Sequence, residues 1–138
     1  MLKSVLAFFA SIALLITLGM AAAGGMLSSL TGYGTAQPSR TAMEDIPPEN
    51  YALYTQAAAT CPGLDWTILA AIGKVESDHA RSTLPGVHSG ANYAGAKGPM
   101  QFLRPTFDAV VAEHPPPPGG ANPPSPYNLH DAVYAAAA

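Results

Sequence analysis

The first forty residues carry almost no charge, and this limits how much of the chain can fold into a domain. After Lys3 the next formally charged residue is Arg40, and the stretch from Val5 to Leu27 is almost wholly apolar. At ~1.5 Å per residue, about twenty-three helical residues are long enough to cross the hydrocarbon core of a bilayer. We therefore expect residues 1–30 to enter a membrane and about one hundred residues to remain, which suits one small domain.

The membrane segment has two interpretations. A cleaved signal peptide would need small residues at its cleavage site, and residues 21–23, which are all alanine, would serve. An uncleaved anchor is favoured by the length of the apolar run. Lys3 would then hold the N-terminus in the cytoplasm, so that the domain faces the outer side of the membrane. The alternative is secretion after cleavage.

Charge and cysteine content argue against a nucleic-acid partner and against a fold held by an internal disulfide. The chain is 11% charged with a formal net charge of -3, so it lacks the basic field that nucleic-acid binding requires. The single cysteine, Cys61, cannot form an internal disulfide and fits no spaced set of metal ligands. We expect Cys61 to be a small buried apolar residue, with a cysteine of another chain or of a C-terminal extension as the alternative partner. Neither a metal nor a cofactor is expected.

The remaining sequence predicts a mainly α domain. Residues 31–46 are glycine, serine and proline-rich without sustained periodicity and are expected to form a flexible linker, with the domain at 47–138. Proline and acidic residues typical of helix starts, with proline and glycine typical of helix ends, predict four helices, at about 47–60, 66–79, 105–114 and 129–138. An irregular loop is predicted for 82–98, and an exposed extended segment for the proline-rich residues 115–126. No alternating strand pattern is visible.

Glu76 is the one acidic residue in an apolar helical pattern. Trp66, Leu69, Ile72 and Val75 recur at intervals of three, which predicts one buried face, and Glu76 follows Ile72 by four residues. Desolvation and the partial negative charge of the helix C-terminus should both raise the pKa of its carboxyl, as suits a general acid. A helical glutamate more often reaches solvent, so this position alone does not identify a catalytic residue.

Two motifs strengthen the case for Glu76. KVESDH at 74–79, a glycine-rich loop, and GPMQF at 98–102 resemble the glutamate-serine and G-x-M-Q motifs of lytic transglycosylases of the SLT (soluble lytic transglycosylase) type. The resemblance extends over about 47–107 and is strongest to small actinobacterial members with an N-terminal membrane segment. It implies a lysozyme-like, goose-type helical fold behind a transmembrane helix. It also implies cleavage of peptidoglycan between N-acetylmuramic acid and N-acetylglucosamine, leaving 1,6-anhydro ends.

The resemblance also implies roles for five residues. Glu76 matches the sole catalytic acid/base of the family, and the substrate-binding positions are matched by Ser77, Gly98, Met100 and Gln101. One carboxyl suffices because it can protonate the glycosidic oxygen and then accept the proton of the muramic C6 hydroxyl. A two-carboxylate hydrolase would need a second acid across the sugar, and Asp65, Asp78, Asp108 and Asp131 are poorly placed for that role.

The sequence departs from this family at its end. Family members continue into a tyrosine-leucine motif and a further helix that close the sugar cleft, whereas this sequence stops at Ala138. The domain is therefore expected to be incomplete at its C-terminus, and the proline run is foreign to the family. Alternatives are a non-catalytic peptidoglycan-binding module and a lysozyme-like hydrolase. The expected partners are glycan strands and the membrane, with a cell-envelope secretion or conjugation apparatus as the setting that the resemblance suggests.

Overall fold

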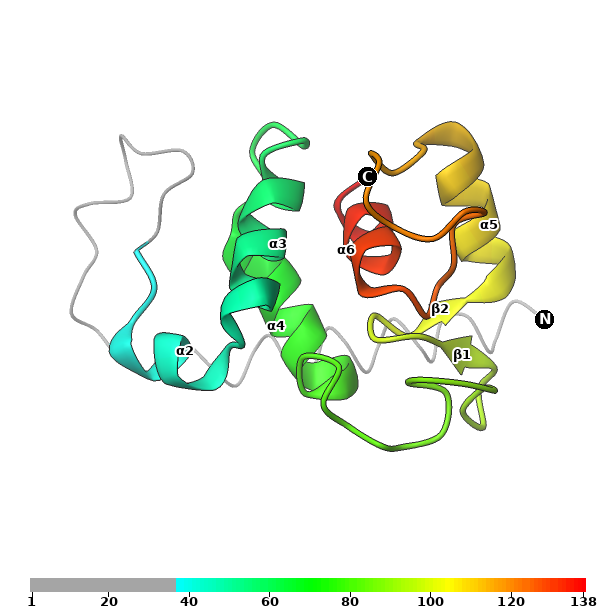
Figure 1. Cartoon of the computed structure of the whole chain (residues 1–138), viewed down its shortest axis with the longest axis horizontal. Helices are drawn as coiled ribbons and strands as arrows, with labels where there is room; N and C mark the ends of the chain where they lie inside the picture. The colour runs from blue at the N-terminus through cyan, green and yellow to red at the C-terminus, as the bar shows by residue number, and fades with distance from the viewer. Residues whose placement is uncertain (1–36) are drawn as a thin grey trace, which may run out of the picture. The chain divides into compact units, whose positions relative to one another are not determined.

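The computed structural model describes residues 37–138, and the predicted membrane segment lies outside them. Five helices and one two-stranded sheet make up the described part (Figure 1). In chain order these are α2 (Arg40–Asp45), α3 (Pro48–Ala58), α4 (Trp66–Ser77), β1 (Ala96–Lys97), β2 (Phe102–Leu103), α5 (Arg104–Glu113) and α6 (Leu129–Ala137). The prediction of a mainly α domain is confirmed.

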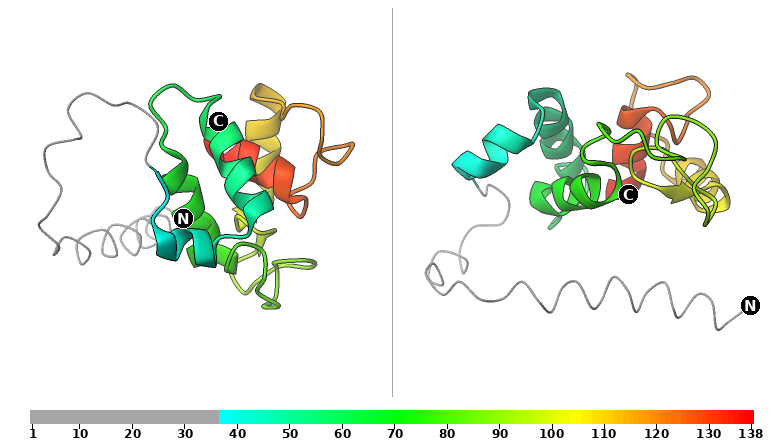
Figure 2. Two further views of the ribbon diagram at one scale, coloured as in Figure 1. Left: turned by 60° about the vertical axis from the view of Figure 1, so that its left-hand side comes forward. Right: turned by 90° about the horizontal axis from the view of Figure 1, so that it is seen from below.

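The core forms where α3, α4 and α6 meet. Each of these helices contacts the other two, and α6 also contacts α5, so that α6 lies between the α3–α4 pair and α5 (Figures 1 and 2). Tyr54 of α3, Leu69 of α4 and Val133 of α6 are fully buried there. Burial of such side chains stabilises each by roughly 1.5–3 kcal/mol relative to exposure.

The predicted helices begin and end close to the residues that mark helix starts and ends in the sequence. Pro48 occupies the first turn of α3, where a missing N–H costs nothing. Asp65 caps α4 by accepting a hydrogen bond from the backbone N–H of Thr67 at 2.9 Å. Trp66 is 7% exposed and packs edge-on against Tyr51, as expected of a core residue.

Several expectations are wrong. Val75, expected on the buried face of α4, is 72% exposed. The buried positions of α4 include Ala70, Gly73 and Ser77, so the buried face does not follow an interval of three. Cys61 is only half-buried.

Two short elements also escaped the sequence prediction. Residues 40–45 of the expected linker form α2, whose N-cap is the Ser39 hydroxyl. Ala96 pairs with Leu103 and Lys97 with Phe102 in an antiparallel ladder, within a stretch for which no strand was predicted. Both elements are too short to leave a periodic pattern.

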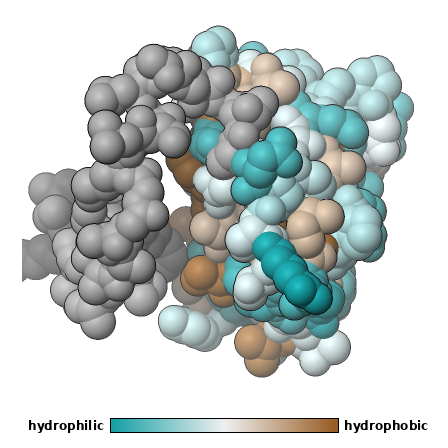
Figure 3. Space-filling model, turned by 90° about the vertical axis from the view of Figure 1, so that its left-hand side faces the viewer, coloured by the Kyte–Doolittle hydropathy of each residue, from teal (hydrophilic) through white to brown (hydrophobic). Residues whose placement is uncertain are grey.

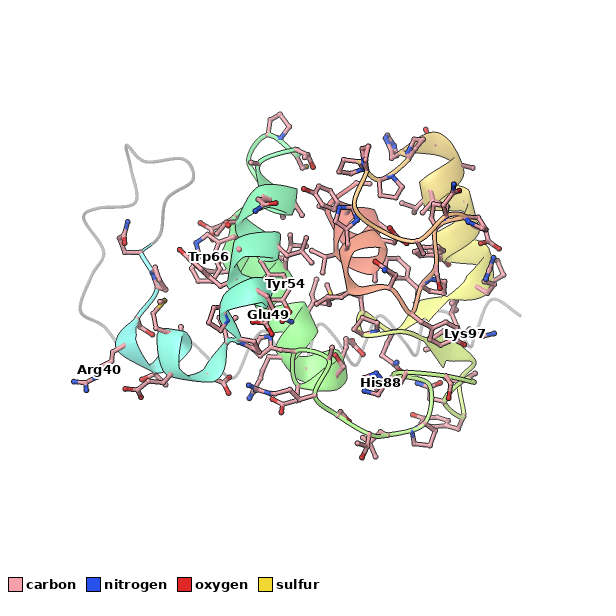
Figure 4. The ribbon with its side chains drawn as sticks, in the orientation of Figure 1. Arg40, Glu49, Tyr54, Trp66, His88 and Lys97 are labelled. Atoms are coloured by element: carbon pink, nitrogen blue, oxygen red, sulfur yellow. The ribbon has the colours of Figure 1, made fainter. Side chains whose placement is uncertain are left out.

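The described surface is mixed in character. On the face that carries α2, small hydrophobic areas are scattered among hydrophilic residues (Figure 3). Figure 4 places Arg40 at this end of the domain, whereas His88, in the glycine-rich loop, and Lys97, in β1, lie toward the other end. Among residues 37–138, no helix combines the length and apolar character needed to cross a membrane.

Candidate functional site

Glu76 lies in the last turn of α4, at the edge of its buried face. Its neighbour Ser77 is 2% exposed, whereas Glu76 itself is exposed, so the expectation that it stands on the buried stripe is wrong. Protein atoms nevertheless partly desolvate the carboxyl, and this raises its pKa above the usual value, in the expected direction. A carboxyl of this kind remains protonated to a higher pH than an ordinary glutamate, while solvent and ligands can still reach it.

The chain after α4 turns sharply in an unusual conformation. Asp78, His79 and Ala80 all have left-handed backbone angles, with φ of 52°, 57° and 69°. Among residues 37–138, the only other non-glycine residue with positive φ is Gln101 of the second motif. A non-glycine residue in the left-handed backbone region costs about 1 kcal/mol or more in conformational free energy. Such a conformation persists where surrounding contacts fix it. Among residues 37–138, the non-glycine residues with left-handed backbone therefore lie in the two motifs or, for Ala80, directly after the first.

His79 is the buried centre of this turn. Its backbone N–H donates to the Gly73 carbonyl at 2.8 Å, and its own carbonyl accepts a hydrogen bond from the Asn50 side chain at 3.0 Å. Its ring Nδ1 lies 3.0 Å from the Tyr54 hydroxyl. A Cβ at Gly73 would lie 2.1 Å from that hydroxyl, so only glycine lets Tyr54 reach the ring. Burial lowers the pKa of His79, which favours its neutral form.

An exposed ion cluster joins α2 to the end of α4. Lys74 Nζ lies 2.8 Å from an Asp45 carboxylate oxygen and 2.7 Å from one of Asp78. Arg81 binds the same two carboxylates, at 3.1 Å and 2.8 Å, and also donates to the Asp45 backbone carbonyl at 2.6 Å. Hydrogen bonds from Arg81 and Lys74 hold the pKa of Asp78 well below its ordinary value. Asp78 is thereby kept ionised and engaged, and is not available as a proton donor.

Ser77 connects the two motifs. Its hydroxyl donates to the Pro99 carbonyl at 2.7 Å, across twenty-two residues of sequence, and accepts from the Ala80 backbone N–H at 2.9 Å. The same side chain therefore ties GPMQF to the end of α4 and supports the left-handed turn. These contacts indicate a positioning role for Ser77, since its buried hydroxyl is already engaged by protein atoms.

Gly98 brings the proline-rich segment against the second motif. Its φ is +79°, and a Cβ there would lie 1.6 Å from the carbonyl oxygen of Pro126. Pro126 is buried, so the expectation that the whole segment 115–126 is an exposed excursion is wrong. The segment is held from the other side by Asp131, which is 1% exposed and accepts the backbone N–H groups of Ala121 and Ser125 at 3.0 Å and 2.9 Å.

Gln101 is organised by the loop that precedes it. Its side-chain amide donates to the Gly98 carbonyl at 2.7 Å, and its side-chain carbonyl accepts from Asn92 at 2.8 Å. Met100 beside it is 6% exposed and belongs to the core. Gln101 is half-buried, so of the five predicted site residues only Glu76 and Gln101 present side chains at the surface, while Ser77, Gly98 and Met100 lie beneath.

Most of the other carboxyls in the described part of the chain are engaged with protein groups. Asp65 caps a helix, Asp131 binds two backbone N–H groups, and Asp108 is paired with Arg104 at 2.8 Å. Asp45 and Asp78 belong to the ion cluster. The remaining acids are Glu44, paired with Arg40, Glu49 in the first turn of α3, and Glu113 in the last turn of α5.

Glu76 is exposed at its place in the last turn of α4. A cavity of about 350 Å³ lies between α2 and α4, and Lys74 and His79 are among its lining residues. Within residues 37–138, no group of three or more His, Cys, Asp or Glu side chains is arranged to hold a metal ion. An exposed acid with a raised pKa can exchange protons with a substrate that reaches it.

Sequence reasoning missed the residues that support the site. Polar groups of three residues lie in the interior: Asn50, Tyr54 and His79. The sequence contains one indication of these contacts, the four-residue spacing that places Asn50 and Tyr54 on one face of α3. Asn92 was not distinguished from the rest of the glycine-rich loop. Comparisons of the chain with protein-family models, with curated proteins and with solved structures gave no match.

Proposed function

We propose that this chain is a peptidoglycan lytic transglycosylase with a lysozyme-like helical domain, in which Glu76 is the single acid/base catalyst. The observation that carries the proposal is the bond from Ser77 to Pro99. It joins the Glu76 motif to the GPMQF motif, which the sequence separates by a long loop. The raised pKa of Glu76 supports the same assignment.

One carboxyl can perform both proton transfers of this reaction. Protonated Glu76 donates its proton to the glycosidic oxygen as the bond from C1 of N-acetylmuramic acid breaks. The resulting carboxylate takes the proton of the C6 hydroxyl of the same sugar, and O6 bonds to C1 to close the 1,6-anhydro ring. The catalyst ends protonated, as it began, and no water is consumed. A hydrolase would instead use a second carboxyl as nucleophile or base. The carboxyls of Asp78, Asp108 and Asp131 are engaged in other contacts.

The proposal extends to the cellular setting. Residues 1–30 would anchor the protein in the membrane with the domain on the outer face, where glycan strands are the substrate. A cell-envelope secretion or conjugation apparatus would be the partner that needs a local opening of the wall.

The test is product analysis with a matched control. Full-length protein in detergent micelles would be incubated with purified peptidoglycan, alongside Glu76→Gln and Glu113→Gln, and the soluble products would be identified by mass spectrometry. Glu113 is an exposed glutamate in the last turn of α5 and lies outside both motifs. We expect anhydro-muropeptides from the wild type and from Glu113→Gln, and at least a hundredfold less from Glu76→Gln.

Other outcomes would overturn the proposal. Muropeptides with reducing ends would identify a hydrolase. Binding of peptidoglycan with no release in any variant would identify a binding module, and equal release by Glu76→Gln would remove Glu76 from the reaction.

A further inference from the structure

A tight turn in the glycine-rich loop carries the most exposed aromatic side chain among the described residues. Residues 92–95 form this turn, in which the Gly95 backbone N–H donates to the Asn92 carbonyl at 3.0 Å. The Asn92 side-chain oxygen accepts from the backbone N–H groups of Ala94 and Ala96 at 2.8 Å and 3.0 Å. The Asn92 backbone N–H also donates to the Ala96 carbonyl at 3.0 Å. Asn92 thereby fixes the backbone on both sides of Tyr93.

Tyr93 stands at the outer position of this turn with a relative exposure of 104%. Within the described part of the chain, neither a hydrogen bond nor a ring contact engages its side chain. Scattered exposed apolar residues are normal on protein surfaces, so exposure alone marks no site. What distinguishes Tyr93 is that its backbone is held by a bonded turn, which presents the ring without support from neighbouring side chains.

That turn belongs to the same bonded unit as the candidate catalyst. Asn92 donates its side-chain N–H to Gln101 at 2.8 Å, and Ser77, next to Glu76, donates to Pro99 at 2.7 Å. The Tyr127 hydroxyl also donates to the Gly90 carbonyl and ties the middle of the loop to the segment before α6. The backbone that carries Tyr93 is thus held by residues that also join the two motifs.

We propose that Tyr93 is a sugar-stacking residue of this site, whose ring receives the C–H face of one pyranose ring of a glycan strand. This inference rests on the proposed function and names a further binding residue for it. A tyrosine ring offers a large contact area at little cost in side-chain entropy, and its electron-rich face attracts the polarised C–H groups of a sugar. A fixed turn lowers the ordering cost of binding further.

Binding can be measured without turnover in the Glu76→Gln background. Full-length protein in detergent micelles would be co-sedimented with insoluble purified peptidoglycan over a range of peptidoglycan concentrations. Into this background Tyr93→Ala, Tyr93→Phe and Leu84→Ala would be introduced. Leu84 is the matched control, because it is also a large exposed side chain, at 70%, and lies earlier in the same loop. Thermal unfolding of each variant would report its stability.

We expect Tyr93→Ala to weaken peptidoglycan binding about five- to tenfold, with an unchanged unfolding temperature. Tyr93→Phe and Leu84→Ala should bind as the background protein does, because the ring and not the hydroxyl makes the contact. Equal binding by Tyr93→Ala and the background protein would overturn the inference, as would an equal loss in Leu84→Ala. A lower unfolding temperature in Tyr93→Ala would do so as well, because it would show a structural role.

The two proposals fail in distinguishable ways. If Tyr93→Ala binds normally while Glu76→Gln abolishes product release, the stacking role is wrong and the transglycosylase proposal stands. If no variant releases product but binding still depends on Tyr93, the catalytic proposal is wrong and the glycan contact remains.

Discussion

Replacing Gly98 by alanine tests whether Pro126, at the end of the proline-rich segment, constrains the GPMQF motif. Gly98 and Gly90 both have positive φ, of +79° and +66°. They differ in their surroundings, because a Cβ at Gly98 would lie 1.6 Å from the Pro126 carbonyl oxygen, whereas a Cβ at Gly90 meets nothing within 4 Å. Gly90→Ala therefore measures the conformational cost alone, and Gly98→Ala adds the cost of the close approach.

The expected magnitudes follow from these surroundings. A left-handed alanine costs about 1–2 kcal/mol, and this is the full effect expected for Gly90→Ala. At Gly98 the Pro126 oxygen would have to withdraw by about 1.4 Å to reach the 3.0 Å that real Cβ contacts keep. Displacing buried backbone by this amount costs about 1–3 kcal/mol more, as for other overpacked sites. We expect Gly98→Ala to lower the free energy of unfolding by about 2–5 kcal/mol in total.

Urea unfolding followed by fluorescence would measure both variants. Trp66 is the only tryptophan of the chain, is 7% exposed and lies 5.0 Å from Tyr51 between ring centroids, so its emission reports the core between α3 and α4. The free energy lost by Gly98→Ala should exceed that lost by Gly90→Ala by at least about 1 kcal/mol, with similar slopes against urea. Equal losses in the two variants would show that Pro126 moves aside freely and does not constrain the motif.

Two further predictions concern buried polar groups. Asp131→Ala leaves the backbone N–H groups of Ala121 and Ser125 without their acceptor and should cost about 2–4 kcal/mol in urea unfolding, whereas Asp108→Ala removes one exposed ion pair and should stay near wild type. Equal effects of these two variants would contradict the assigned contacts. Because the pKa of His79 is lowered in the folded protein, the unfolded chain binds the imidazole proton more tightly. The stabilisation by neutral His79 is therefore complete above about pH 6.5. It is lost as the pH falls through the pKa of His79 in the folded protein. Wild type should therefore lose more stability between about pH 7.5 and 5 than His79→Gln does, and parallel losses would refute this assignment.

Local punctuation explains why most helices could be predicted from the sequence. Pro48 and the Asp65 cap act within one turn of their helices, so their effects are readable without knowing the fold. The short helix α2 was missed because the contacts that hold its end are distant in sequence. Asp45 binds Lys74 and Arg81, which follow it by 29 and 36 residues.

The motifs pointed to candidate site residues but not to the contacts that hold them in place. The motifs indicated Glu76 and Gln101, and the structure leaves both side chains at the surface. The face of α4 was misjudged because its buried positions include Gly73 and Ser77, which give no hydrophobic signal. Small residues are needed there because Tyr54 approaches Gly73 closely, and such a requirement for space leaves no periodic pattern in a sequence.

The ion cluster at α2 has a mechanical consequence. Any chain that precedes Ser39 joins the described domain at α2, and Asp45 at the end of this helix binds Lys74 and Arg81, on either side of the turn after α4. A pull on the N-terminal side of α2 would load these ion pairs before it reached the packing of α3 on α4. Exposed ion pairs weaken as salt rises. Ionic strength would therefore set how firmly tension applied at the start of α2 is transmitted to the end of α4.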